Sequence, residues 1–372
     1  MSKKKKVLIV NETMQYGGSD LVAVRLQQNL NQDKFECVYC IRRSRKGPME
    51  PIVEQSGVRI IHQPDDKLSY VNSYKFYLDL FKKEHFDIVH CHLPFYSGIV
   101  MLAAYKAKIE KRISHSHFSQ PLVLTGSRLK LILANIFRAI MRKVIALFST
   151  DVIGCSKESG IYLVGKKAFN KKGIVLNNGI DTSVYAYNTA LRNEKRKELG
   201  VEDKTVIGHI GQMYYVKNHN FLIDVFYEFQ KDNPDSVLML VSDGPDREKL
   251  ELKVKELGID DKVRFLGFRD DIPELMIAMD CFVFPSIHEG FPLTLIEAQS
   301  AKLPCIVSDT VTPDVKLSDA LSFLSIEEKP AFWCDEIKKM LSLDRAEINN
   351  DKVLEEFSIK NVCKKLEKIY LK

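Results

Sequence analysis

Glu289 and Glu297 lie eight positions apart and follow a short apolar run at residues 281–284. This order predicts a buried strand, a loop that carries Glu289, and a helix that begins near Leu293 with Glu297 about one turn inside it. The free N–H groups and the positive dipole at the start of such a helix suit a diphosphate. The carboxylates can accept hydrogen bonds from sugar and ribose hydroxyls, each contributing about 1.5–3 kcal/mol. The structural alternative is that the glutamates only complement the helix dipole.

Two other predicted strands are followed by residues suited to a phosphate. Lys217 comes shortly after the apolar run 205–210, and its charge could neutralise a phosphate, although a solvent-exposed lysine is the ordinary alternative. Gly17 and Gly18 lie between the first apolar run, 7–11, and a predicted helix. Glycines at such a turn let the backbone approach a phosphate, although most glycine turns only change the direction of the chain.

Four histidines form two His-x-His pairs at the ends of predicted strands, namely His90 with His92 and His115 with His117. Residues two apart in a strand point to the same face, so each pair presents its two rings together. Four imidazoles could indicate zinc. However, no carboxylate cluster accompanies them, and the ends of parallel strands converge in any case, so we expect no metal. His90 and His92 are expected to be structural or to line an acceptor site.

Strands and helices alternate along almost the whole chain, and they must position these residues. Predicted strands occupy 7–11, 36–41, 58–62, 87–92, 112–115, 152–155 and 173–176, then 205–210, 237–241, 263–265, 281–284 and 304–307. Predicted helices occupy 19–30, 70–84, 97–108 and 128–148, and others begin near residues 218, 246, 271 and 293. This alternation predicts βαβ units and parallel sheets.

We therefore predict an α/β chain of two doubly wound, Rossmann-like domains that face a central cleft. A length of 372 residues exceeds one ordinary core. The predicted domains are 1–185 and 186–355. The amphipathic segment 356–372, which no strand follows, is predicted to pack back on the N-terminal domain. Open α/β sheets bind ligands at the carboxyl ends of their strands, so the loops there should carry the function.

Composition restricts the partners and the compartment. The chain has 55 basic and 49 acidic residues, and this mild excess favours phosphate-bearing ligands or an anionic membrane over nucleic acid. The apolar run after Lys3–Lys6 is too short for a signal peptide, and no stretch has the roughly 18 uncharged apolar residues of a spanning helix. Eight scattered cysteines, with one Cys-x-x-Cys pair, Cys37 and Cys40, indicate reduced structural thiols. We expect a cytoplasmic location.

Taken in order, these motifs resemble the retaining glycosyltransferases of family 4, which have the GT-B fold, and in particular bacterial capsular and exopolysaccharide enzymes. The family hallmark E-G-F-G-x-x-x-x-E matches residues 289–297, except that Pro292 replaces a glycine. The family segment V-G-R-x-x-x-x-K-N-H is similar to residues 210–219, except that Gln212 replaces the arginine. Shorter matches occur at 178–181, 242–245 and 265–268, so the resemblance extends from Gly17 to about residue 314.

The resemblance implies a role for each matching residue. The catalytic group would be Glu289 at the donor sugar, Lys217 at the diphosphate and His117 at the sugar or acceptor. Residues implied in donor binding are Gly17, Gly18, Gly211, Gln212, Lys217, Asn218, Gly244, Phe268, Gly290, Phe291, Leu293, Thr294 and Glu297, the last at the ribose. His115, Asn178 and Asp181 would line the acceptor side or the cleft. No cofactor and no metal are implied.

The implied reaction transfers a sugar from a nucleoside diphosphate donor of the UDP-sugar class to a hydroxyl of a lipid-linked or glycan acceptor, with retention at the anomeric carbon. Two departures keep a catalytically weak or inactive nucleotide-sugar-binding protein open: Gln212 lacks the charged fork of arginine, and Pro292 has no N–H. A glycoside hydrolase, which also uses paired carboxylates, is the second alternative. A dehydrogenase is disfavoured because no G-x-G-x-x-G follows the first strand.

The segment 127–149 combines a stripe of leucine, isoleucine and phenylalanine with five basic residues. A basic amphipathic helix of this kind can lie on an anionic bilayer, which predicts peripheral contact with the inner face of the plasma membrane. The alternative is that the apolar stripe packs on the sheet.

Overall fold

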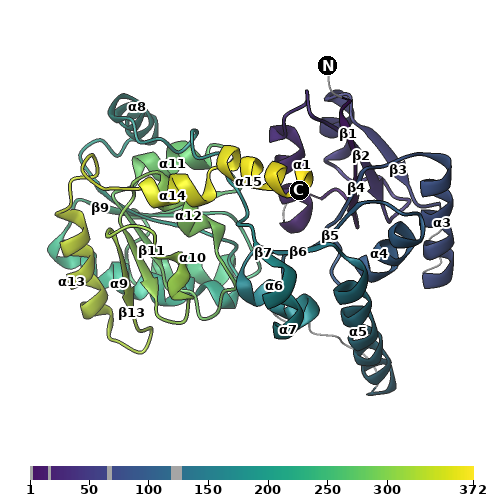
Figure 1. The fold of residues 1–372 in the computed structure, drawn as a ribbon. Coiled ribbons are helices and arrows are strands. Elements are labelled where there is room, and N and C mark those ends of the chain that lie inside the picture. The colour runs from purple at the N-terminus through teal and green to yellow at the C-terminus, as the bar shows by residue number, and fades with distance from the viewer. Residues whose placement is uncertain (1–2, 16–17, 65–68, 119–127) are drawn as a thin grey trace. The chain divides into compact units, whose positions relative to one another are not determined.

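The structure, a computed structural model, describes residues 3–15, 18–64, 69–118 and 128–372, and it divides into two compact units. Unit 1 comprises Met1–Gly179 together with Ile359–Lys372, and unit 2 comprises Ile180–Ser358. Each unit has its own parallel sheet with helices on both faces (Figure 1). The predicted α/β class with two Rossmann-like units is confirmed.

Unit 1 has a seven-stranded sheet in the order β3-β2-β1-β4-β5-β6-β7. The strands are β1 Lys5–Asn11, β2 Phe35–Ile41, β3 Arg59–His62, β4 Ile88–Cys91, β5 Lys111–Ser116, β6 Asp151–Gly154 and β7 Gly173–Val175. The helices are α1 Gly18–Asn29, α2 Glu50–Gln55, α3 Tyr70–Lys83, α4 Ser97–Lys106, α5 Arg128–Phe148, α6 Lys157–Val164, α7 Lys166–Lys172 and α15 Ile359–Leu371.

The alternation of side chains along β1 separates two cores in unit 1. Val7 and Ile9 face a cluster with residues of α1 and α15, whereas Leu8 and Val10 face a cluster with residues of α3 and α4. Because both faces of a parallel sheet are covered, the strand is apolar throughout rather than alternating with polar residues.

Unit 2 has a six-stranded sheet in the order β10-β9-β8-β11-β12-β13. The strands are β8 Thr205–Ile210, β9 Ser236–Val241, β10 Val263–Gly267, β11 Cys281–Phe284, β12 Cys305–Ser308 and β13 Leu321–Leu324. The α-helices are α8 Thr189–Leu199, α9 His219–Asp232, α10 Arg247–Glu256, α11 Ile272–Ala278, α12 Leu293–Ser300, α13 Pro330–Leu341 and α14 Asp351–Phe357, with 3₁₀ turns at Tyr215–Lys217 and Pro313–Val315. Val206 and Ile207 of β8 face opposite cores, the second of which contains Trp333 of α13.

The units divide at different residues from those that the sequence suggested. The segment after Gly179 belongs to unit 2, because the Ile180 N–H donates to the Phe357 carbonyl at 2.8 Å and Tyr185 is buried in the unit 2 core. The chain leaves unit 2 after Ser358, and α15 completes a core of unit 1. The junctions are therefore 179/180 and 358/359 instead of 185/186 and 355/356.

Candidate functional site

Lys217 and Glu289 form an ion pair in unit 2, with 2.6 Å between Nζ and Oε1. Their side chains are only 20% and 16% exposed. Lys217 follows β8 and Glu289 follows β11, and these strands are neighbours in the sheet. Parallel neighbours end at the same edge, so residues far apart in the sequence meet there.

The backbone of both loops holds this pair. The Ile287 N–H donates to the Val216 carbonyl at 2.8 Å, which ties the two loops together. Asn218 adopts a left-handed conformation with φ of 56° and starts α9. A side chain at Gly211 would place its Cβ 3.4 Å from Cδ and Cε of Lys217 and 3.1 Å from Nε2 of His209. The glycine therefore leaves room for the lysine stem.

The predicted helix after Glu289 begins at Leu293, and Glu297 is its fifth residue. Pro292 precedes the helix with φ of −75° and ψ of 106°. Because Pro292 has no N–H, the first amides that this helix can offer belong to Leu293 and Thr294. Gly290 is exposed, whereas the ring of Phe291 stacks on Phe357 with centroids 5.6 Å apart, which leaves the backbone rather than the ring for a ligand.

The loops after β9 and β10 complete this edge of unit 2. Gly244 packs so closely on Met213 that a Cβ would lie 2.6 Å from the Met213 carbonyl oxygen, which locks the β8 and β9 loops together. Phe268, after β10, exposes 74% of its surface. Gln212 is also exposed, next to Gly211. The candidate donor-binding residues of unit 2 thus lie on loops after four strands of one sheet.

Four histidines of unit 1, His90, His92, His115 and His117, form one cluster of neighbouring rings at the ends of β4 and β5. His90 Nε2 lies 3.1 Å from His115 Nδ1, and His92 Nδ1 lies 2.9 Å from His117 Nε2. Each of these two pairs has one further hydrogen-bonding partner. In the first pair, His90 Nδ1 is 2.7 Å from the Tyr370 hydroxyl. His117 Nδ1 is 3.3 Å from Asn178 Oδ1. The side chains thus form two hydrogen-bonded chains of three residues.

Burial sets the charge state of this cluster. It lowers the pKa of His90 to about 3 and that of His117 to about 4, and it lowers the pKa of His92 and His115 well below 6.5. The rings are therefore neutral at neutral pH. Since Asn178 Oδ1 can only accept, His117 carries its proton on Nδ1, and its Nε2 accepts from His92.

Ring nitrogens of His90, His92 and His115 lie within 4.8 Å of one another, which is a spacing that could hold a metal ion. Neutral imidazoles are suitable ligands. In the structure, however, His90 Nε2 and His115 Nδ1 are used in the hydrogen bond between the two rings. Among the described residues, nothing bonds the buried Nε2 of His115. The predicted absence of a metal stays a prediction.

The remaining candidates are Gly17, Gly18 and Asp181. Gly18 opens α1 with φ of 55°, and Gly17 falls outside the described residues. Asp181 is exposed, and its carboxylate accepts from the Ser183 backbone at 3.0 Å, so its side chain caps its own turn. Asp181 also belongs to unit 2, whereas His115, His117 and Asn178 belong to unit 1.

Two residues at the strand ends of unit 1 were missed by sequence reasoning. Tyr370 meets His90 across 280 residues, and no local pattern marks such a contact. Asp20 is buried and accepts from Asn11, Thr13 and the Gln15 backbone, so it fixes the loop after β1. An aspartate in the first turn of a helix, two residues after a pair of glycines, was the available signal for this role.

Comparison with known proteins decides the family. Residues 16–184 match the family model described as Glycosyltransferase Family 4, and residues 192–352 match the model described as Glycosyl transferases group 1. The chain belongs to glycosyltransferase family 4. This glycosyltransferase is similar to EpsF of Bacillus subtilis, with 29% identity over 92% of the chain and 90% of EpsF.

Two further relatives and one solved structure are informative. The capsular polysaccharide biosynthesis glycosyltransferase CapH of Staphylococcus aureus is 27% identical over 98% of both chains. An Escherichia coli UDP-Gal:alpha-D-GlcNAc-diphosphoundecaprenol alpha-1,3-galactosyltransferase is 31% identical over 66% of this glycosyltransferase and 62% of its own length. The crystal structure of Anabaena HepE in complex with UDP has a TM-score of 0.77 at 18% identity and covers 98% of both chains, which shows the shared GT-B fold.

Proposed function

We propose that this glycosyltransferase moves a sugar from a UDP-sugar to a hydroxyl of a lipid-linked glycan, with retention, during synthesis of a capsular or extracellular polysaccharide. The ion pair of Lys217 and Glu289 beside the start of α12 carries the proposal, because it places a cation, a carboxylate and free helix amides at one edge of a sheet. The names of CapH, of the Escherichia coli galactosyltransferase and of the HepE complex with UDP support the substrate classes.

The charges of the pair suit the two ends of a nucleotide-sugar. In the structure, the Lys217 ammonium group and the Glu289 carboxylate are paired with each other. A bound diphosphate would accept hydrogen bonds from the Lys217 ammonium group and from the amides of Leu293 and Thr294. The Glu289 carboxylate would then accept hydrogen bonds from sugar hydroxyls. Glu297, one turn into α12, would accept from the ribose hydroxyls. The site therefore holds its charged groups in place before the donor arrives.

The proposed reaction is a front-side displacement. The anomeric carbon loses its bond to the β-phosphate oxygen and gains a bond to the acceptor oxygen on the same face. The leaving phosphate takes the proton of the acceptor hydroxyl. Lys217 and the α12 amides stabilise the negative charge on the leaving group, and Glu289 stabilises the positive charge on the sugar. Since these groups supply the charge stabilisation, the proposal includes no metal ion and no cofactor.

His117 has a limited role in this scheme. A pKa of about 4 keeps its ring neutral, so it cannot donate a proton as an imidazolium at neutral pH. Its two nitrogens are already bonded to His92 and Asn178. The Asn178 bond, at 3.3 Å, is the longer one and the one that a substrate hydroxyl would replace. His117 is therefore proposed as a neutral hydrogen-bonding group toward the sugar or the acceptor.

The test compares Glu289→Gln with Glu336→Gln. Glu336 is a matched control, because its side chain is also 16% exposed and it pairs with Lys339 at 3.2 Å. Transfer from a UDP-sugar to a lipid-linked acceptor should fall by about 10² or more in Glu289→Gln, as expected for an electrostatic group at the reacting carbon. The control should stay near wild type, and both variants should keep the wild-type melting temperature within a few degrees.

Three outcomes would contradict the proposal. Unchanged transfer in Glu289→Gln would remove its assigned role. Binding of UDP without turnover on any acceptor would favour the nucleotide-sugar-binding alternative, which is based on the neutral Gln212 and on Pro292, a residue without an N–H. NMR of the product showing an inverted anomeric configuration would remove the front-side mechanism.

The helix α5 supports membrane contact as a further part of this proposal. Of its 21 residues, Ile145 is the buried one. Its exposed apolar residues are Leu129, Ile132, Leu133, Ile136, Ile140 and Leu147. The helix also carries Arg128, Lys130, Arg138, Arg142 and Lys143. In Figure 1, α5 projects beyond the rest of its unit.

Most of the α5 stripe is therefore not used in packing on the sheet. Within the described residues, no helix is both long and apolar enough to cross a bilayer. A helix with exposed apolar side chains and basic neighbours can instead lie in the interface of an anionic membrane. We infer that α5 holds the enzyme at the inner face of the plasma membrane, where a lipid-linked acceptor is available. Ser127, the first residue of the predicted segment, lies outside the described residues.

A further inference from the structure

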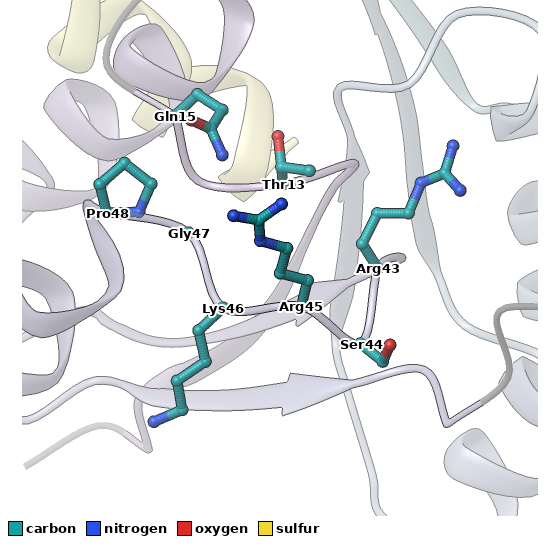
Figure 2. A pocket seen from close by; sticks show the side chains of 8 residues that line it. All are labelled: Thr13, Gln15, Arg43, Ser44, Arg45, Lys46, Gly47 and Pro48. Carbon is teal, nitrogen blue, oxygen red and sulfur yellow. The ribbon is translucent and has the colours of Figure 1, made fainter.

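Unit 1 contains a basic cavity that the proposed function does not use. Its volume is about 730 Å³, and it is lined by Thr13, Gln15, Arg43, Ser44, Arg45, Lys46, Gly47 and Pro48 (Figure 2). The first two residues follow β1 and the others follow β2, so the cavity lies at the carboxyl ends of two neighbouring strands. Three of the lining residues are basic and none is acidic.

The cations of this cavity are only partly neutralised. Arg43 pairs with Glu12 at 2.7 Å, and Lys46 lies 3.4 Å from Glu54 with both side chains largely in solvent. For Arg45, the described part of the chain provides no ion pair and no hydrogen bond. Figure 2 shows its guanidinium extended toward Thr13 and Gln15. One permanently charged, five-donor group is thus available to an anion in the cavity.

The walls of the cavity are fixed by backbone contacts. A Cβ on Gly47 would lie 2.5 Å from the Met14 carbonyl oxygen, so the two loops are in direct contact. The Met49 N–H donates to the same carbonyl at 3.0 Å, and the Gly47 N–H donates to Glu50 at 2.6 Å. On the other wall, Asp20 accepts from Thr13 and from the Gln15 backbone. The cavity is therefore formed before a ligand binds.

The cavity is close to the histidine cluster along the same sheet edge. The backbone N–H of His92 donates to the Val10 carbonyl of β1, and the backbone N–H of Arg42 donates to the Asn11 carbonyl of the same strand. His117 follows β5, and from the end of β5 it is two strand spacings, about 10 Å, to the end of β1 and three, about 14 Å, to the end of β2. A sugar beside His117 could therefore extend one substituent into the basic cavity.

We propose that this cavity binds the diphosphate of a lipid-linked acceptor, with Arg45 and Lys46 as the principal contacts. This proposal rests on the proposed function, since it assigns the acceptor its anchoring group. A diphosphate fits the observations because the cavity offers several cationic donors and no carboxylate. The donor diphosphate has its own cation, Lys217, in unit 2.

The first experiment measures binding without turnover. Inorganic pyrophosphate is titrated calorimetrically into protein saturated with UDP, so that the donor site in unit 2 is already occupied. The double variant Arg45→Ala/Lys46→Ala should weaken pyrophosphate binding at least about tenfold, as expected for lost charge-assisted hydrogen bonds. The control Lys82→Ala/Lys83→Ala removes the same charge from exposed positions at the end of α3 and should bind like wild type.

The second experiment assigns the anion to the acceptor. Steady-state kinetics compare a sugar linked to a short polyprenyl diphosphate with the same sugar as an uncharged alkyl glycoside. The double variant should raise KM at least tenfold for the diphosphate acceptor only. The KM of the UDP-sugar and the rate with the alkyl glycoside should not change.

Several results would overturn the proposal. These are absence of pyrophosphate binding by the wild type, an equal loss in the control variant, or a higher KM for the UDP-sugar in the double variant. If the double variant loses binding to phosphatidylglycerol vesicles but keeps pyrophosphate binding, the cavity is a lipid head-group contact instead. Failure of the wild type to transfer any sugar would refute the proposed function, and the calorimetric result would still decide whether the cavity binds a diphosphate.

Discussion

Acid should destabilise unit 1 through its histidine cluster. The rings of His90, His92 and His115 are at most 2% exposed, and burial lowers the pKa of each below the ordinary 6.5. When the pH falls, the unfolded chain therefore takes up protons before the folded one does. The stability that depends on neutral rings is fully present above about pH 6.5 and is lost as the pH falls toward the folded-state pKa values.

The magnitude follows from linkage. Between about pH 7.5 and about pH 5.5, one ring that titrates near 6.5 when unfolded and stays neutral when folded costs about 1.4 kcal/mol of unfolding free energy. The three buried rings together should cost about 4 kcal/mol over this range. This loss is a large share of the free energy of unfolding of a folded domain, which is typically about 5–15 kcal/mol.

Urea unfolding at the two pH values measures this effect. Far-UV circular dichroism follows both units, whereas the fluorescence of Trp333, the single tryptophan and a residue buried in unit 2, follows that unit alone. Each of His90→Gln and His115→Gln should reduce the pH-dependent loss by about 1.4 kcal/mol. His85→Gln is the matched control, because the His85 side chain on the same unit is 75% exposed. Equal pH dependence in all three variants and the wild type would refute the reasoning.

Three further outcomes are expected. Gln212→Arg should tighten UDP binding about fivefold, because it adds a charged donor at an exposed position in the same loop as Lys217. Calorimetry measures the affinity for UDP, and an equal gain in Gln212→Leu would contradict the prediction. Arg345→Leu should destabilise unit 2 by about 3 kcal/mol or more, because the buried guanidinium donates to the carbonyls of Ile277, Met279 and Ala301. Urea unfolding followed by Trp333 fluorescence measures this loss, and a loss under about 1 kcal/mol would contradict the prediction. Leu133→Glu/Ile136→Glu should abolish flotation with anionic vesicles without a change in melting temperature, whereas unchanged flotation would exclude α5 as the contact.

The parts of the site that local order determines could be predicted from the sequence. Glu289 lies in a loop between a buried strand and a helix, and Lys217 follows the neighbouring strand in the same way. In a parallel sheet, this order alone brings the two loops to one edge. The hydrophobic runs predicted the strands for the same reason, since both faces of each sheet are covered.

Side-chain directions and distant contacts could not be predicted in this way. The pattern around Phe291 does not say that its ring turns toward Phe357, and nothing near His90 indicates the Tyr370 hydroxyl. For α5, the same amphipathic pattern fits a helix packed on a sheet and one with an exposed stripe, because the periodicity fixes a face but not its neighbour. The basic cavity was missed because it depends on close contact between Gly47 and Met14, on separate loops.

The last helix has a consequence for how the protein is made. Because α15 supplies buried residues such as Val362 and Leu366 to the core of unit 1, that unit lacks part of its interior until residues 359–371 have been synthesised. All of unit 2 has been synthesised by then. Although its synthesis begins first, unit 1 cannot complete its core before α15 is available, and a chain that is cut short after Ser358 would have an open, aggregation-prone unit 1.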